Sequence, residues 1–280
     1  MSGWLEGKEA EHFLVHAAKD GRPFSKVKIR NASIEGLHLQ GLILAESELE
    51  NIVFNKTSLA RCVFTNSRVK ALSFVDVVLD HMTFHKCELI EVSTSGLKGR
   101  GLALSDCSIV DADFFQSKFV EAKFINSRFS NSQFRSSNLD NAVYAKADFD
   151  AVKFEGCYMK QTVFHDLDLR GCQFVRVNAP MIVFSSSHLE GLDLCDSTLP
   201  HGQFSRSHLT QTRFDRSNLS GACFVGANLT GAQMISANLS TAAFLDAKMG
   251  GINLEKANLD QARVIRCNLE NGQLSGMTSR

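Results

Sequence analysis

The sequence has no excess of charge of either sign. Lys plus Arg and Asp plus Glu both total 30, so the formal net charge is zero. A chain without a net field has no general attraction for nucleic acid or for an anionic membrane surface. We therefore expect no direct binding to nucleic acid.

Long apolar segments are missing as well. No stretch is long and apolar enough to span a bilayer, so we expect no membrane span. The N-terminal stretch MSGWLEGKEAEHFLVHAAKDG lacks the basic start and the unbroken apolar core of a secretory signal peptide. We expect a cytoplasmic protein, with secretion by a route that needs no signal peptide left open.

Common signatures of catalysis are also absent. The sequence contains no phosphate-binding glycine loop, no G-x-S-x-G, no H-E-x-x-H and no C-x-x-C. We therefore predict no enzymatic activity, no catalytic residues and no cofactor.

What the chain does contain is an apolar residue at every fifth position. From Phe24 to Leu274 each of these central residues is large and apolar except Thr94, Gly99 and Ala179. Neither a helix, with a period of about 3.6 residues, nor a strand, with a period of 2, produces this spacing. A small or aliphatic residue lies two positions before each centre, and six of the 8 cysteines occupy that position: Cys62, Cys87, Cys107, Cys157, Cys172 and Cys267.

Blocks such as ANLTG and ADFDA resemble those of the pentapeptide-repeat family, and the resemblance covers most of the chain. It implies an all-β solenoid, a right-handed quadrilateral β-helix in which four pentapeptides make one coil of 20 residues. At that length the chain would form about 13 coils, stacked at the spacing of neighbouring strands. The bacterial cytoplasm is the setting that we expect.

Residues 20 apart should then lie above one another on one face of the solenoid. Phe164, Phe184, Phe204 and Phe224 are one such column, which predicts a buried ladder of stacked rings rather than a surface that binds bases. Gly221 and Gly231 follow centres at positions that suit the positive φ of a type II turn.

Three segments depart from the repeat. Residues 1–22 should form a helical cap, with an amphipathic helix over 2–20 that Ser2 caps at its start and that Gly21 and Pro23 terminate. The β-helix is expected over 23–274, with an irregular coil near 92–102 because Thr94 and Gly99 fill the core poorly. Residues 275–280 form a C-terminal tail that covers the last coil only thinly.

The 20-residue spacing also aligns polar side chains. Asp148, Asp168, His188 and His208 fall in one outward column. Carboxylates and imidazoles bind Zn²⁺, but ligands on a straight line do not converge on a tetrahedral point. We predict a solvated polar column without a metal, with Asp168, His188 and His208 as the residues to inspect.

Apolar residues recur at outward positions where the repeat favours polar ones. They are Val143, Val163, Val183, Val225, Leu245 and Ile265. Because contiguous apolar patches usually mark an interface, we predict that a protein partner binds here. A homodimer through the C-terminal coils is one form that this contact could take.

Three classes of function are compatible with these features. The first is a non-catalytic scaffold that presents a rigid face to another protein. The second, implied by the family resemblance, is mimicry of DNA towards type II topoisomerases such as gyrase; it requires an acidic surface, whereas this chain is neutral. The third is a bacterial effector or a secretion-accessory protein. We favour the scaffold.

Overall fold

The structure is a computed structural model that describes residues 3–278. Backbone contacts group the chain into two compact units, Met1–Val143 and Tyr144–Arg280, and each is described by itself. Both have the repeating coil of a β-solenoid. Among the described residues, no helix is long and apolar enough to cross a membrane.

The first unit contains one helix, α1 (Gly7–Asp20), followed by short strands. Its strands are β1 (Leu5–Glu6), β2 (Phe24–Ser25), β3 (Lys28–Glu35), β4 (Ile43–Ala45), β5 (Glu48–Asn55), β6 (Val63–Thr65), β7 (Arg68–Val75), β8 (Thr83–His85), β9 (Glu88–Ile90), β10 (Ser93–Ser95), β11 (Lys98–Arg100), β12 (Ala103–Ser105), β13 (Ser108–Val110), β14 (Asp113–Phe115), β15 (Lys118–Val120), β16 (Lys123–Ile125), β17 (Arg128–Ser130) and β18 (Gln133–Arg135).

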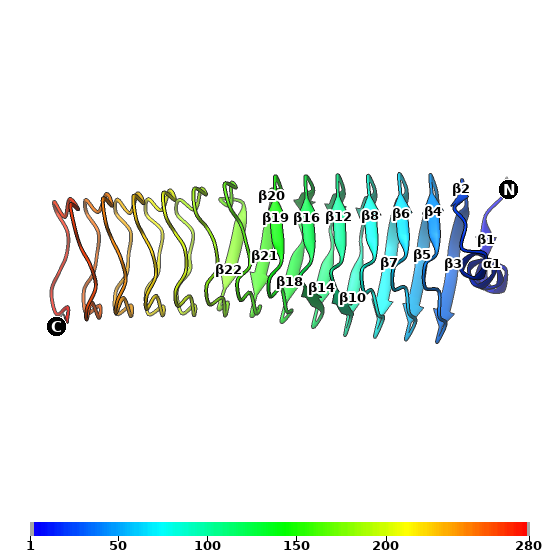
Figure 1. The fold of residues 1–280 in the computed structure, drawn as a ribbon, viewed down its shortest axis with the longest axis horizontal. Coiled ribbons are helices and arrows are strands. Elements are labelled where there is room, and N and C mark those ends of the chain that lie inside the picture. The colour runs from blue at the N-terminus through cyan, green and yellow to red at the C-terminus, as the bar shows by residue number, and fades with distance from the viewer. Residues whose placement is uncertain (1–2, 279–280) are drawn as a thin grey trace. The chain divides into compact units, whose positions relative to one another are not determined.

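The strands of this unit pair in parallel with the strand one coil further on, so that they follow one another as rungs (Figure 1). The pairing from β2 through β4, β6 and β8 to β12 and β16 makes one side of the coil. The long strands β3, β5 and β7 bend around a corner and contribute to two further sides. The fourth side holds the bridge Val78↔Lys98 and the pair β11–β15. Every one of these partners is 20 residues away, as the repeat predicts.

The second unit has few regular strands. They are β19 (Val143–Ala145), β20 (Asp148–Asp150), β21 (Val152–Glu155) and β22 (Cys172–Val175). The first of these strands, β19, begins one residue before the second unit. From Tyr158↔Asn178 to Asn258↔Thr278, isolated bridges with the same 20-residue spacing join successive coils. Within the described residues the 20-residue spacing therefore runs from Phe24↔Leu44 to Asn258↔Thr278, which agrees with the expected count of about 13 coils, although the regular strands end at Val175.

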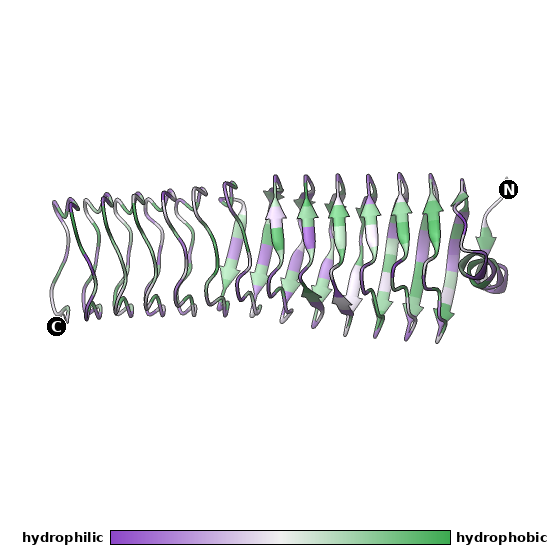
Figure 2. Ribbon diagram, in the orientation of Figure 1, coloured by the Kyte–Doolittle hydropathy of each residue, from purple (hydrophilic) through white to green (hydrophobic). Residues whose placement is uncertain are grey.

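The two inward positions of each pentapeptide form the core. The central residues and those two places before them are buried almost throughout, whereas the remaining three positions face outwards, which gives the alternating hydropathy in Figure 2. In the second unit, Phe184 stacks on Phe164 at 5.5 Å between ring centroids, and Phe224 on Phe204 at 4.9 Å. The predicted aromatic ladder is confirmed.

Cysteine and serine are interchangeable at the smaller inward position. The Cys87 thiol donates to Phe64 O, and the Ser137 hydroxyl makes the equivalent bond to Phe114 O, each 23 residues back. Five of the six repeat-frame cysteines are buried free thiols, and burial raises the pKa of Cys62 to about 12. Cys267, in the last coil, is only half-buried.

Helix α1 covers the first coil, as predicted, but it begins later than expected. Leu5 and Glu6 instead pair with Ile29 and Arg30 as β1, so the helix starts at Gly7, and Ser2 lies outside the described residues. Ala10, Leu14 and Ala17 are buried against the coil. Gly21, with φ of 67°, ends the helix and donates its N–H to Ala17 O.

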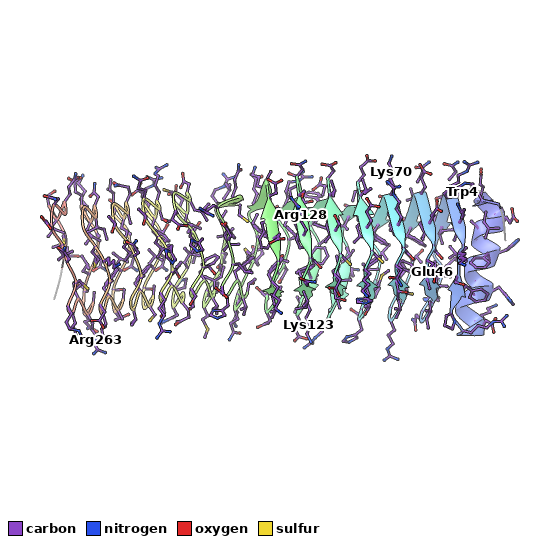
Figure 3. The ribbon with its side chains drawn as sticks, turned by 90° about the horizontal axis from the view of Figure 1, so that it is seen from above. Trp4, Glu46, Lys70, Lys123, Arg128 and Arg263 are labelled. Carbon is purple, nitrogen blue, oxygen red and sulfur yellow. The ribbon has the colours of Figure 1, made fainter. Side chains whose placement is uncertain are left out.

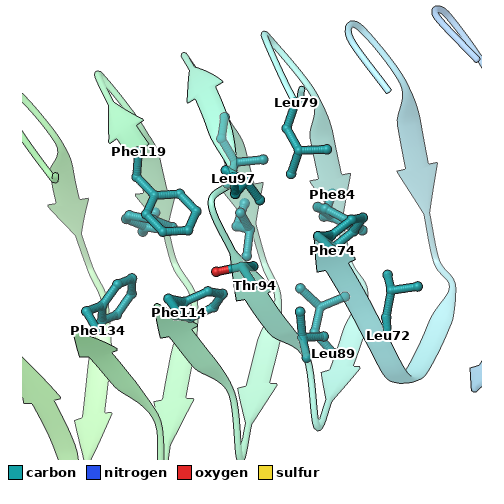
Figure 4. A pocket seen from close by; sticks show the side chains of 14 residues that line it. Leu72, Phe74, Leu79, Phe84, Leu89, Thr94, Leu97, Phe114, Phe119 and Phe134 are labelled. Carbon is teal, nitrogen blue, oxygen red and sulfur yellow. The ribbon is translucent and has the colours of Figure 1, made fainter. Parts of the chain in front are cut away.

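The irregular coil expected near 92–102 is not observed. β10 pairs in register with β7 and β14, and β11 pairs with β15. Thr94 and Gly99 lie at normal inward positions, and an apolar cavity of about 30 Å³ lies beside Thr94 (Figure 4). The backbone keeps its ladder because the coils on both sides fix the register.

The backbone ladder of the second unit is interrupted around the coil that contains Gly171. No hydrogen bond joins the backbone of residues 173–176 to that of residues 191–196, although the equivalent bond Phe214 N→Gln233 O is present further on. A surface groove opens there, bordered by Arg170, Arg176 and Asp193. The ladder resumes at Ala179 N→Thr198 O.

Candidate functional site

The candidate polar column lies on the outer surface of the second unit. Asp168 bridges in register to His188, and His188 bridges to His208, so the predicted alignment of these three residues is correct. The two imidazole rings are nearly parallel, with centroids 4.3 Å apart. Asp148 forms no bridge to Asp168 but lines a shallow surface hollow with it.

The carboxylate of Asp168 forms an ion pair with a neighbouring arginine side chain. The guanidinium of Arg170 donates two hydrogen bonds to its carboxylate, at 2.9 and 2.6 Å. This contact holds the pKa of Asp168 at about 2. Asp168 is therefore an arginine partner, and it is not free to meet the imidazoles.

Glu190 takes the place that Asp168 leaves. Its Oε1 lies 2.9 Å from His188 Nδ1 and 3.9 Å from His208 Nδ1. One ligand atom from each of the three residues lies within 4.8 Å of the others. The 20-residue alignment does not indicate Glu190, because it lies two residues beyond His188, towards the next corner of the same coil.

The Glu190 carboxyl stays ionised in this setting. Burial raises its pKa, but the hydrogen bond from His188 and the nearby imidazoles outweigh burial, and the net shift is downward. Its Oε2 is buried and forms no hydrogen bond within the described residues. The cluster thus offers two imidazole nitrogens and one carboxylate oxygen as ligand atoms.

The outward apolar residues form two separate groups in the second unit. Val163 and Val183 bridge to each other, whereas Gln203 follows them in that column. Val225, Leu245 and Ile265 lie on successive coils, since Gly226 N binds Leu245 O and Asp246 N binds Ile265 O. Val143 begins β19 and is half-buried.

Exposure of the second group increases towards the last coil. Val225 and Leu245 are half-buried, whereas Ile265 and its neighbour Val264 are 39% and 41% exposed. Beneath them, core residues such as Leu254, Leu259 and Leu274 line an apolar hollow together with Met277, which is also exposed.

The outer edge of this last coil also carries unpaired backbone groups. One coil earlier, the N–H groups of Phe244, Met249 and Leu254 donate to carbonyls of the next coil. Within residues 3–278, the equivalent N–H groups of Val264, Leu269 and Leu274 donate no hydrogen bond. The edge is therefore both apolar and able to pair with another strand.

Charged side chains project outwards all along the chain (Figure 3). In the second unit three aspartates pair with an arginine 20 residues later. Arg216 binds Asp196 with two hydrogen bonds of 2.7 and 2.6 Å, and Arg213 binds Asp193 at 2.8 Å. These arginines neutralise the charge of the two aspartates locally.

Comparison with known families identifies the repeat. A profile described as "Pentapeptide repeat region" matches residues 147–224 and 197–274, and one described as "Pentapeptide repeats (8 copies)" matches residues 107–143. Together these matches cover more than half of the chain. Among curated proteins, none matches it.

Several solved structures are similar to this chain. A pentapeptide repeat protein from the thylakoid lumen of Arabidopsis thaliana is 33% identical over 34% of this chain and 66% of that one, with a TM-score of 0.33. HetL from the cyanobacterium Nostoc, involved in the regulation of heterocyst differentiation, is 19% identical over 95% and 94% of the two chains, with a TM-score of 0.28. The plasmid-mediated fluoroquinolone resistance protein QnrB1 is 16% identical over 80% and 92%, with a TM-score of 0.34.

Proposed function

Because the chain belongs to the pentapeptide-repeat family, we propose that it is a non-catalytic scaffold that binds another protein chain through its C-terminal coils. The observation that most supports this proposal is the outer edge of the last described coil. Exposed Val264, Ile265 and Met277 lie there beside backbone N–H groups that donate no hydrogen bond within residues 3–278. An exposed apolar strand edge is a ready template for pairing with a second chain.

The occupant that we infer is a second copy of this chain. At this edge, N–H groups such as that of Val264 alternate with carbonyl groups such as that of Ala262. The equivalent carbonyl one coil earlier, Ala242 O, accepts a hydrogen bond from the coil that follows it. An edge with both donors and acceptors is complementary to its own copy when the two meet across a two-fold axis. The same contact buries the exposed aliphatic residues of both copies.

The acidic mimicry considered from sequence has no supporting observation. Mimicry of a duplex requires an uncompensated negative face. Here Asp193, Asp196 and Asp246 each bind an arginine on the following coil. The surface charge supports a neutral scaffold instead.

The test is the mass of the protein in solution. We expect the wild type to sediment as a dimer at tens of micromolar, and Leu245→Lys with Ile265→Lys to sediment as a monomer, because two buried charges would face each other across the two-fold axis. The matched control is Gln161→Lys with Gln211→Lys. It adds the same charge at exposed corners with positive φ, a position that Lys56 and Lys256 already occupy.

Either of two results would reject this interface. One is a wild type that is already monomeric at that concentration. The other is a Leu245→Lys, Ile265→Lys variant that still dimerises while its circular-dichroism spectrum matches the wild type.

A further inference from the structure

We propose that His188, Glu190 and His208 form a binding site for a transition-metal dication such as Zn²⁺. Two imidazole nitrogens and one carboxylate oxygen are a common protein ligand set for zinc, with a fourth position left for water or another ligand. The site lies on the outer surface of the second unit, and the scaffold role proposed above neither requires it nor explains it.

The placement of Glu190 removes the geometric difficulty of a straight column. His188 and His208 lie one above the other on adjacent coils, so by themselves they define a line. Glu190 approaches both Nδ1 atoms from the neighbouring corner, at 2.9 and 3.9 Å. Three ligands that are not collinear can surround one ion.

The distances are close to those that a bound ion requires. Zinc–ligand bonds of 2.0–2.1 Å place neighbouring ligand atoms about 3.3 Å apart in a tetrahedral site. The observed contact of Glu190 with His188 is slightly shorter than this, and that with His208 slightly longer. The imidazoles are 43% and 50% exposed, so each ring can tilt towards a common point without disturbing the core.

A second observation also indicates a cation. Glu190 Oε2 is buried and has no hydrogen-bond partner within the described residues. A buried carboxylate oxygen without a donor costs free energy that a bound cation would recover. A cation bound to this carboxylate would compensate that cost, which the hydrogen bond between His188 and Oε1 leaves in place.

The surrounding charges permit a cation at this place. Arg170 interacts electrostatically with Glu190, but its guanidinium is held by Asp168 in two hydrogen bonds. Asn228 follows His208 in the column, and Thr210 follows Glu190 at the corner one coil later; both are neutral.

The experiment is a calorimetric titration of the full chain with ZnCl₂, after treatment with a chelator and its removal. We expect one Zn²⁺ per chain in the wild type. Glu190→Gln and His208→Ala should each weaken binding by more than the roughly tenfold that loss of an outer hydrogen-bond partner costs at a metal site. Zn²⁺ should raise the unfolding temperature of the wild type and leave that of the two variants unchanged.

Two control variants separate this site from adventitious ones. His201→Ala removes an exposed histidine outside the cluster, and Cys195→Ser removes the half-buried thiol nearest to it in sequence. Both should bind Zn²⁺ as the wild type does. The proposal is wrong if the wild type binds no Zn²⁺, if Glu190→Gln and His208→Ala bind it equally well, or if Cys195→Ser abolishes binding.

Discussion

Single residues at the corners of the coils adopt a backbone conformation that ordinary side chains avoid. Every fifth residue from Lys26 to Gly276 has a positive φ, except Gly171. The left-handed conformation costs roughly 1 kcal/mol for a residue with a side chain. Most corners recover that free energy, because their N–H donates across coils, as Lys56 does to Val75 O at 2.9 Å.

This corner geometry shows what the sequence can predict at the scale of a residue. Gly221 and Gly231 were expected to have positive φ, and they do. Nothing in the local sequence predicts the same conformation for Thr241, whose branched side chain disfavours it. The ladder that compensates Thr241 is a tertiary feature, so it is visible only once the repeat has been recognised.

The cavity at Thr94 follows from a comparison of two costs. Leaving about 30 Å³ empty costs on the order of 0.7 kcal/mol at about 24 cal/mol per Å³. A bulge would break several backbone hydrogen bonds, each contributing about 1 kcal/mol. The coil therefore keeps its register and tolerates the void, which is why the irregular segment expected from sequence does not form.

Thr94→Leu should consequently stabilise the protein. Leucine is the commonest alternative at central positions, and filling the void should raise the free energy of unfolding by about 1 kcal/mol. The hydrogen bond to Ser117 is lost, but the Ser117 hydroxyl still donates to Phe115 O. Urea denaturation followed by circular dichroism measures the change.

The control for that substitution is Thr212→Leu. Thr212 is completely buried at a smaller inward position and donates to Leu189 O at 2.8 Å. Overpacking there should lower the free energy of unfolding by about 1–3 kcal/mol. If Thr94→Leu is destabilising like Thr212→Leu, the cavity cannot accept a side chain.

At the scale of elements, Gly171 coincides with the break in the ladder. It is the one repeat corner from 26 to 276 without a positive φ, and a Cβ on it would lie 2.6 Å from Phe149 O. The coil that follows this corner fails to bond to the next one over residues 173–176. The altered corner and the missing contact between two coils therefore occur together.

Amide exchange should be faster at this break than elsewhere in the second unit. Phe174 N and Arg176 N face the next coil without an acceptor, whereas their counterparts Phe214 N and Arg216 N donate at 2.7 and 2.9 Å. We expect the first two amides to exchange at least about tenfold faster, because no inter-coil bond must open first. Hydrogen exchange followed by NMR compares all four within one molecule.

Equal protection of the four amides would mean that the ladder is closed in solution. That outcome would also remove the groove beside Asp193 as a feature of the folded protein.

The start of helix α1 and the cluster of His188, Glu190 and His208 are two features that the sequence pattern predicts only in part. The helical spacing of Phe13, Leu14 and Ala17 predicted the cap, but the pairing of Leu5 with Ile29 depends on a strand far along the chain. Glu190 was missed for a related reason. The 20-residue alignment places His188 and His208 on one face, whereas the third residue of the cluster, Glu190, comes from the adjoining corner.

Across the whole molecule, charge is balanced locally as well as in total. Asp196 and Asp246 each bind the arginine 20 residues later, through two hydrogen bonds. These pairs could have been read from the sequence once the coil length was known, because residues 20 apart are neighbours. The net charge of zero alone gives no indication of them.

The same pairs predict how stability depends on pH. Arg170 holds the pKa of Asp168 at about 2, and Arg216 and Arg266 lower the pKa values of Asp196 and Asp246. A carboxyl with a folded-state pKa below its unfolded value near 3.9 stabilises the fold above that value, and this contribution is lost as pH falls through the folded pKa. We therefore expect the urea midpoint to change little from pH 7 to about 5 and to fall steeply between about pH 4 and 2.

Asp168 and Arg170 provide the decisive comparison for this pH dependence. Asp168→Asn removes the titrating group and Arg170→Gln removes the charge that shifts it, so each variant should lose the same part of the steep decline below about pH 4. The double variant should lose no more than either single one, because both changes abolish one interaction. Because the pair is more than half exposed, 1 M NaCl should weaken the effect in the wild type. If both single variants retain the wild-type decline, the acid sensitivity arises from groups other than this arginine-paired carboxylate.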